Sequence, residues 1–291
     1  MSVVAIVLGL AAAALFAVGS VLEQRATKRQ KQTRTLDPRL LLQLLREPMW
    51  FAGWVPDLGG TVLQAVALRF GPLALVEPML LAGVLLAIPL EAAFEKRRPH
   101  ARDLTVVVLG AIGLAAFLVA AAPRGGINEP KTGDWLRVMA ALAVVFAACL
   151  FFAWCARNTT RGILLGVATG LLYALAASLL KSVTVQLGRG LPETFSHWHV
   201  YALLVAGVGG MMLNQNAFQG GPIAAPLTTI AMTDPVVSIG IGITAFHEQL
   251  SVDGPRLAIE ILAGLLMIFV LWLAHTIRGN NGNNGNNGAQ H

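Results

Sequence analysis

Long apolar runs make up most of the chain, and short polar segments separate them. A transmembrane helix needs about 20 mostly apolar residues. Nine runs have this length, and we expect each to be a helix: Ser2–Leu22, Trp50–Leu68, Leu73–Phe94, Leu104–Ala122, Trp135–Cys155, Gly162–Val185, His199–Phe218, Ile223–Phe246 and Leu257–Ile277. The pattern therefore predicts an all-α, polytopic membrane protein with the lipid bilayer as its first partner.

The two ends of the chain differ in character. The first run has no basic residues ahead of it and is too long for the apolar core of a signal peptide, so we expect a retained helix. The last stretch, GNNGNNGNNGAQH at 279–291, is a low-complexity repeat with no apolar side chains to bury except one alanine. We expect this tail to be disordered.

Composition agrees with a membrane protein and excludes an ordinary soluble domain. Of 291 residues, 56% are hydrophobic and only 12% are charged, and the mean hydropathy is +0.67. The net charge of +6 could suggest nucleic acid as a partner, but the basic residues lie in the segments between apolar runs, as the positive-inside rule predicts. With the N-terminus outside, fourteen of the 21 Lys and Arg residues fall on the inner side. We therefore predict a multi-pass protein of the cell (inner) membrane, N-terminus outside and C-terminus cytoplasmic, that binds no nucleic acid.

An internal repeat divides the chain into two similar halves. Glu77-Pro78 matches Asp234-Pro235 at an offset of 157 residues, and Gly59-Gly60 matches Gly209-Gly210 at an offset of 150. We expect a first four-helix unit at 1–122, a linker loop and connecting helix at 123–156, and a second four-helix unit at 157–278. One extra helix between the units reverses the second one, which gives the inverted repeat common in secondary transporters. A duplication kept for packing alone is the alternative.

Asp234 and Glu77 are the best candidate site residues. A carboxylate inside a bilayer is costly, and such residues commonly bind a proton or a cation. Pro78 and Pro235 follow the two acids, and each removes a helical hydrogen bond and frees a carbonyl oxygen. The alternative for each acid is a position near the interface or at the cap of a broken helix.

Other polar residues of the matched helices could contact a solute. Gln64 and Asn214 place amides at matching depths, and Asn216 lies close by in the sequence. Such amides either bind a polar solute or hold helices together. Asp57 could be a third acid, and Thr61, one turn later, is a further candidate for binding the solute or ion. An interfacial position of Asp57 near its helix start is an equal reading.

Several further polar residues favour structural roles. Glu91 and Glu248 each follow a proline of the repeat by thirteen residues, and we expect them to stabilise the turn at a helix end. Lys181 is expected to mark a membrane interface. His197 and His199 lack a third ligand for a metal and are expected in a solvated interfacial loop.

The segment DPVVSIGIGITAFHEQL from Asp234 resembles the drug/metabolite transporter superfamily and its EamA-type repeat. The nine-helix layout resembles the NIPA-like magnesium-transporter branch more closely. So do two segments, WFAGWVPDLGGTVLQAVALRFGPLALVEP and LNQNAF. Where that branch has an acidic residue after a glycine in its second helix, this chain has Gly60-Thr61.

The resemblance implies a permease that moves a small solute, a drug or a metabolite, by alternating access, coupled to protons or cations and without a cofactor. One alternative is a NIPA-like magnesium transporter with Asp234 and Glu77 as the metal ligands, because Mg²⁺ prefers oxygen donors. Another is a non-transporting membrane scaffold or regulator. No nucleophile, base and orienting residue share one depth, so we do not expect an enzyme. A second copy of the chain is a further possible partner, in a homodimer.

Overall fold

The computed structural model describes residues 2–29, 48–94, 96, 98, 100–217, 224–251, 254, 258–267, 269, 270 and 273. All named elements in these ranges are α-helices: α1 (Val3–Arg29), α3 (Pro48–Phe70), α4 (Leu73–Phe94), α5 (Ala101–Ala121), α6 (Thr132–Cys155), α7 (Asn158–Leu187), α8 (Leu191–Ser196), α9 (Trp198–Ala217) and α10 (Ala224–Thr244). Residues 258–267 form a further helical segment. The all-α prediction is confirmed, while the 279–291 tail lies outside the described residues.

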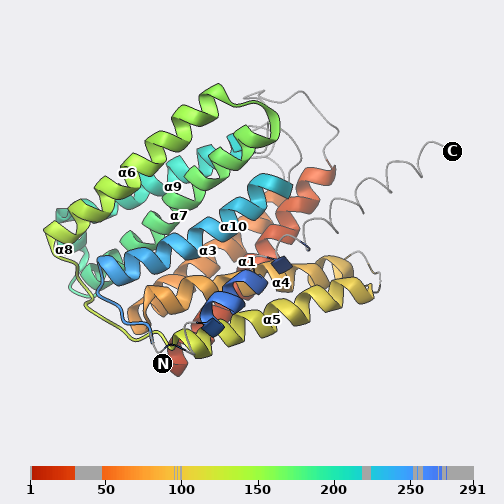
Figure 1. The fold of residues 1–291 in the computed structure, drawn as a ribbon, viewed down its shortest axis with the longest axis horizontal. Helices are drawn as coiled ribbons and strands as arrows, with labels where there is room; N and C mark the ends of the chain where they lie inside the picture. Colours follow the sequence, from red (N-terminus) through yellow and green to blue (C-terminus); the bar gives the residue numbers. More distant parts are fainter. Residues whose placement is uncertain are drawn as a thin grey trace.

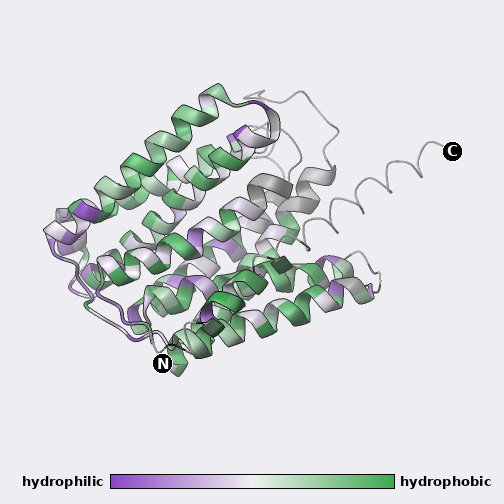
Figure 2. Cartoon of the chain, viewed as in Figure 1, coloured by the Kyte–Doolittle hydropathy of each residue, from purple (hydrophilic) through white to green (hydrophobic). Residues whose placement is uncertain are grey.

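Five helices are long and apolar enough to cross a membrane: Val3–Leu22, Leu73–Phe94, Asp103–Ala121, Thr132–Cys155 and Thr159–Leu187. Three shorter apolar helices accompany them, at Trp198–Asn214, Thr228–Thr244 and Ala258–Met267. Apolar residues cover α5 and α6, whereas polar residues gather in the connecting segments at the end of the bundle near the N-terminus (Figure 2). These helices are consistent with a membrane location; the count of nine crossings stays a prediction.

The helices pack as two groups that meet along α4 and α10. In the first group α1 packs against α3 and α4, and in the second α7 packs against α9 and α10. Helices α5 and α6 lie on opposite sides of the bundle (Figure 1). The largest buried cluster forms where the groups meet and includes Leu73, Leu179 and Phe246. Large apolar side chains such as Val119, Trp154 and Val205 are exposed on the outside, as lipid-facing residues are.

Small residues allow the helices of each group to approach closely. A Cβ added to Gly83 of α4 would lie 2.7 Å from the carbonyl oxygen of Ala13 in α1. Close approach of this kind is typical of helix pairs in membranes, because small residues let two backbones come into contact. A Cβ added to Gly207 of α9, by contrast, would have no heavy atom of another described element within 4 Å.

The segment between α5 and α6 is tied to the segment after α10. Arg124 and Gln249 exchange backbone hydrogen bonds of 2.9 and 3.2 Å in an isolated antiparallel bridge. The Ile127 amide donates to the Phe246 carbonyl at 2.7 Å, and the Ser251 amide donates to the Ala121 carbonyl at 2.9 Å. These bonds fix residues 245–251 at the end of the bundle that also holds the N-terminus (Figure 1).

Gly83→Ala should destabilise the protein, whereas Gly207→Ala should not. The new methyl at position 83 meets backbone atoms of α1, and overpacking of this kind costs about 1–3 kcal/mol. At position 207 the methyl enters open space, and alanine is the better helix former by about 1 kcal/mol. Thermal unfolding in detergent can be measured as the loss of the folded peak in size-exclusion chromatography. The midpoint temperature should be lower than that of the wild type for Gly83→Ala only. Equal midpoints would contradict this packing.

Candidate functional site

Two carboxylates, one on α4 and one on α10, lie on the pair of helices that joins the two groups. Glu77 of α4 is only 2% exposed, and its Oε1 accepts a hydrogen bond of 2.9 Å from Nε2 of Gln64 in α3. Asp234 of α10 is partly buried, and its Oδ1 accepts a hydrogen bond of 3.3 Å from Ser238. The charges of the two carboxylates are near enough to repel each other. We refer to Glu77 and Asp234 as the acid pair.

Local sequence features explain this placement. The first two turns of α4, Leu73–Met79, are buried throughout, so Glu77 cannot reach solvent from its position. Helix α7 approaches α10 beside the second acid, because a Cβ on Gly170 would lie only 2.6 Å from Cβ of Thr233 and 3.2 Å from the Asp234 amide nitrogen. Pro78 and Pro235 lie inside their helices, so the carbonyl four residues before each lacks its usual partner.

The acid pair suits one proton or a cation. Two carboxylates whose charges interact in a medium of low polarity cannot both stay charged at low cost, so protonation of one of them or a bound cation lowers the energy. Among the described residues no group of three His, Cys, Asp or Glu side chains could hold a metal ion. A Mg²⁺ ion at the acid pair would therefore complete its shell with neutral oxygens or water, as this ion often does.

The remaining predicted site residues do not share the described contacts of the acid pair. The buried Oδ1 of Asn214 has no hydrogen-bond partner among the described residues, and none of the described hydrogen bonds joins its side chain to an acid as Nε2 of Gln64 is joined to Glu77. Thr61 and Asn216 are exposed, and each donates to its own helix, at the carbonyls of Asp57 and Met212. The structure thus brings Glu77, Gln64 and Asp234 together; none of the described hydrogen bonds joins Thr61 or Asn216 to them.

A second buried polar site lies at the N-terminus of α4. Oε1 of Glu248 accepts hydrogen bonds from the Leu73 amide at 2.6 Å and from Nζ of Lys181 at 2.5 Å. Oε2 accepts from the Ala74 amide at 2.9 Å. The side chains of Lys181 and Glu248 are 3% and 0% exposed. One carboxylate thus satisfies two free amides at the start of α4 and neutralises a buried lysine from α7.

Residues Phe246, His247 and Glu248 form what we term the end clamp. Phe246 is fully buried, with its ring 4.6 Å from Nζ of Lys181 and its centroid 6.0 Å from that of Trp135. His247 has a left-handed backbone with φ of 52°, which is uncommon for a residue other than glycine. This conformation places its Nε2 3.4 Å from Oδ2 of Asp134, so all three clamp side chains contact other helices.

The sequence analysis expected Lys181 at a membrane interface but did not predict its partner: the side chain is buried in an ion pair with Glu248 at one end of the bundle. The sequence held the signal: a lysine inside a long apolar run needs a partner, and Glu248 was an acid of matching depth. The structural role expected for Glu248 at a helix end is confirmed by its contacts. Its repeat counterpart Glu91 differs, because it lies within α4 and not in a loop.

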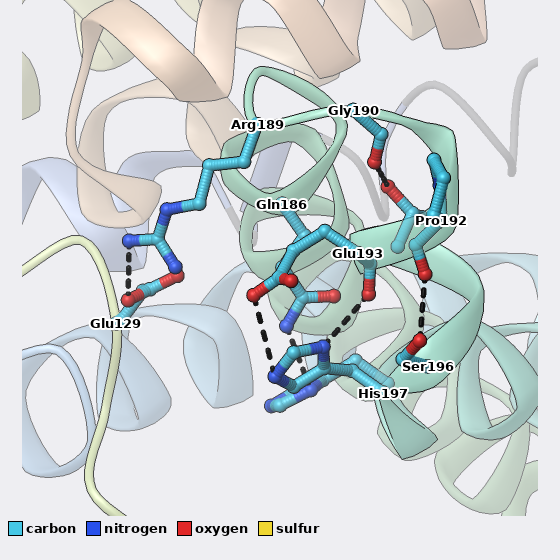
Figure 3. Close-up of polar contacts among 10 residues, drawn as sticks. Glu129, Gln186, Arg189, Gly190, Pro192, Glu193, Ser196 and His197 are labelled. Atoms are coloured by element: carbon cyan, nitrogen blue, oxygen red, sulfur yellow. Dashed lines mark hydrogen bonds and ion pairs between the residues drawn. The ribbon is translucent and has the colours of Figure 1, made fainter.

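The histidines of the SHWH motif have protein partners around α8 (Figure 3). Nδ1 of His197 lies 2.8 Å from the Glu193 carbonyl, and Nδ1 of His199 lies 3.0 Å from Nε2 of Gln186. Nearby, Arg189 donates to Glu129 at 2.8 Å, and this contact raises the pKa of the Arg189 guanidinium. These contacts around α8 therefore connect α7, α8 and α9 to one another and to the segment before α6.

Comparison with known proteins finds a similar protein to which no function is assigned. The chain is 25% identical over 277 residues to an uncharacterized protein of Corynebacterium glutamicum, covering 94% of this chain and 96% of the relative. A scan against protein-family models finds no match. No solved structure matches the chain.

Lys181→Met should destabilise the protein strongly. It leaves the Glu248 carboxylate buried without its cation, and breaking a buried ion pair from one side costs about 3–5 kcal/mol. Adding Glu248→Gln should recover part of the loss, because no charge then remains buried alone. Thermal unfolding of the two single variants and the double variant in detergent provides the measurement. Additive losses would contradict the coupling of these two side chains.

Proposed function

We propose that the chain is a secondary membrane transporter that moves a small solute by alternating access, with proton or cation coupling at the acid pair. The observation that carries this proposal is the meeting of Glu77 and Asp234. They occupy equivalent positions of the sequence repeat, each precedes a proline, and their charges interact where α4 and α10 pack. Two acids brought together from two repeats are the arrangement expected of a coupling site between inverted halves.

Contacts at matching glycines support the inverted repeat. Added Cβ atoms on Gly59 and Gly60 of α3 would meet Leu15 and Phe16 of α1, at 3.1 and 2.9 Å. Those on Gly209 and Gly210 of α9 would meet Leu172 and Tyr173 of α7, at 3.5 and 2.7 Å. The partners in α7 are the residues 157 positions after those in α1, and the glycines are 150 positions apart. Two independent helix pairs therefore use the same contacts at aligned positions.

The proposed topology has nine crossings, with the N-terminus outside. Residues 70–72, 123–128 and 245–251 share one end of the bundle with Ser2, as expected if these links all lie on the outer side. On this proposal the chain is a member of the drug/metabolite transporter superfamily, similar in layout to its NIPA-like branch. The solute would be small and polar, because the groups near the acid pair are an amide and a hydroxyl.

In a transport cycle on this framework, the two ends of the bundle would open and close in turn, so that one end is closed while the other is open. In the structure the end clamp joins α10 to α4 and α7, at the end that the proposed topology places outside. Opening there must break the Glu248 contacts with Leu73, Ala74 and Lys181. Loading or unloading of a proton at the acid pair would change the repulsion between α4 and α10. Binding at the site could then bias which end is closed, as a ligand with different affinity for two states does.

Glu77→Gln and Asp234→Asn should abolish coupled transport while leaving folding intact. Each change keeps the side-chain shape and removes a charge from a crowded acid pair, so stability should hold or rise. Proteoliposomes with an imposed pH gradient would be tested for uptake of labelled anionic, neutral and cationic solutes, and for Mg²⁺ entry with an internal dye. We expect pH-driven solute uptake by the wild type, and its loss in both variants.

Glu193→Gln is the matched control, because it removes a carboxylate on α8 that contacts His197 and not the acid pair. It should transport like the wild type. Mg²⁺ entry that needs both acids but no pH gradient would instead identify a magnesium transporter. Normal folding with no flux of any probe would contradict transport and favour a scaffold.

A further inference from the structure

A polar cavity opens at the same end of the bundle as the end clamp. Its volume is about 250 Å³, many times the space that a single water needs. Its walls come from Ser2, the C-terminal end of α3 and its link to α4, the segment between α5 and α6, and α7. It lies apart from the acid pair, none of whose residues lines it.

The described residues that line this cavity include three cationic side chains and no acidic one: Arg69, Arg124 and Lys181. Lys181 is neutralised by Glu248, which does not itself line the cavity, so the net positive charge of the lining comes from the two guanidinium groups. Among the described residues Arg124 has no side-chain hydrogen bond or ion pair, so all its donors are available. Guanidinium groups bind carboxylate and phosphate oxygens with paired hydrogen bonds.

Both arginines are held on fixed backbone. Arg69 donates from Nη1 to the Thr184 carbonyl at 3.2 Å, and its guanidinium lies over Gly188. Arg124 sits in the backbone bridge to Gln249. A Cβ on Gly126 would clash with the Phe246 carbonyl oxygen, so this segment approaches the end clamp as only glycine permits. A rigid frame of this kind reduces the entropy lost when a ligand binds.

We infer that this cavity is an oxyanion-binding site, in which Arg69 and Arg124 hold a carboxylate or phosphate group. The ligand is either the anionic group of a small solute in water or the phosphate of a lipid headgroup, because the topology proposed above places this end of the bundle at the outer membrane surface. The inference goes beyond the proposed transport, since binding at the cavity needs neither Glu77 nor Asp234.

Binding of inorganic phosphate to the full-length protein in a neutral detergent tests the inference. Titration calorimetry at constant ionic strength, with chloride as the replaced anion, should give saturable binding to the wild type. Arg124→Gln should weaken it by about tenfold or more, because a hydrogen bond to a charged group is lost. Arg69→Gln combined with Arg124→Gln should abolish it. A normal elution profile and unfolding midpoint without phosphate would show that each variant is folded.

Lys131→Gln is the matched control, since Lys131 is exposed near the same end but does not line the cavity. It should bind phosphate like the wild type. No saturable binding by the wild type, undiminished binding by the double arginine variant, or an equal loss in the control would each overturn the site.

Nanodiscs identify the source of the anion. Phosphate binding in phosphatidylcholine discs that disappears in phosphatidylglycerol discs would support the site with a lipid headgroup as its ligand. Equal binding in both discs would support the site with a free solute as its ligand. Because the readout is binding and not flux, a failed transport assay leaves this test unaffected.

Discussion

The ion pair between Lys181 and Glu248 is the contact on which the arrangement of the helices depends most. Inside a membrane protein, unpaired charges and free amides at helix ends are costly because no water is available to satisfy them. Glu248 meets three such demands at once, from Lys181 and from the amides of Leu73 and Ala74. The pair fixes α4, α7 and the segment after α10 relative to one another. Its contribution is therefore greater to the geometry than to net stability, since buried pairs recover little beyond their desolvation.

Helices α4 and α7, together with α10 itself, also surround the acid pair. Helix α4 carries Glu77, α10 carries Asp234, and α7 approaches Asp234 through Gly170. A shift of α10 against α4 would alter the acid pair and the end clamp together, because one helix connects them. This physical link is what a coupled transporter requires between its central site and a gate, and it needs no chain of intermediate residues. The proposed coupling therefore rests on rigid elements shared by two polar sites.

Sequence reasoning found the apolar helices, and it selected Glu77 and Asp234 as candidates, for a physical reason. Apolar length and the cost of a charge in a bilayer are properties of single segments, so both are visible in one chain. The partnership of Lys181 with Glu248 joins residues 67 positions apart, and periodicity carries no information on such contacts. Likewise, Gln64 and Asn214 look equivalent in the repeat, yet among the described hydrogen bonds only that of Gln64 reaches an acid, and the repeat alone does not predict this difference. The cavity was missed because Arg69 of α3 and Arg124 of the segment between α5 and α6 meet only in the fold.

The proposed oxyanion site and the end clamp share Lys181, and this has an energetic consequence. While Glu248 holds the lysine, the cavity faces a neutral pair and two arginines. If the clamp opened and Glu248 withdrew, the cavity would gain a third positive charge with no acid among its described lining residues. An oxyanion would then bind the open state more tightly than the closed one, and by linkage its binding would favour opening. An anion at this cavity would thus act as more than a passive ligand: its charge would oppose the contact that keeps this end of the protein closed.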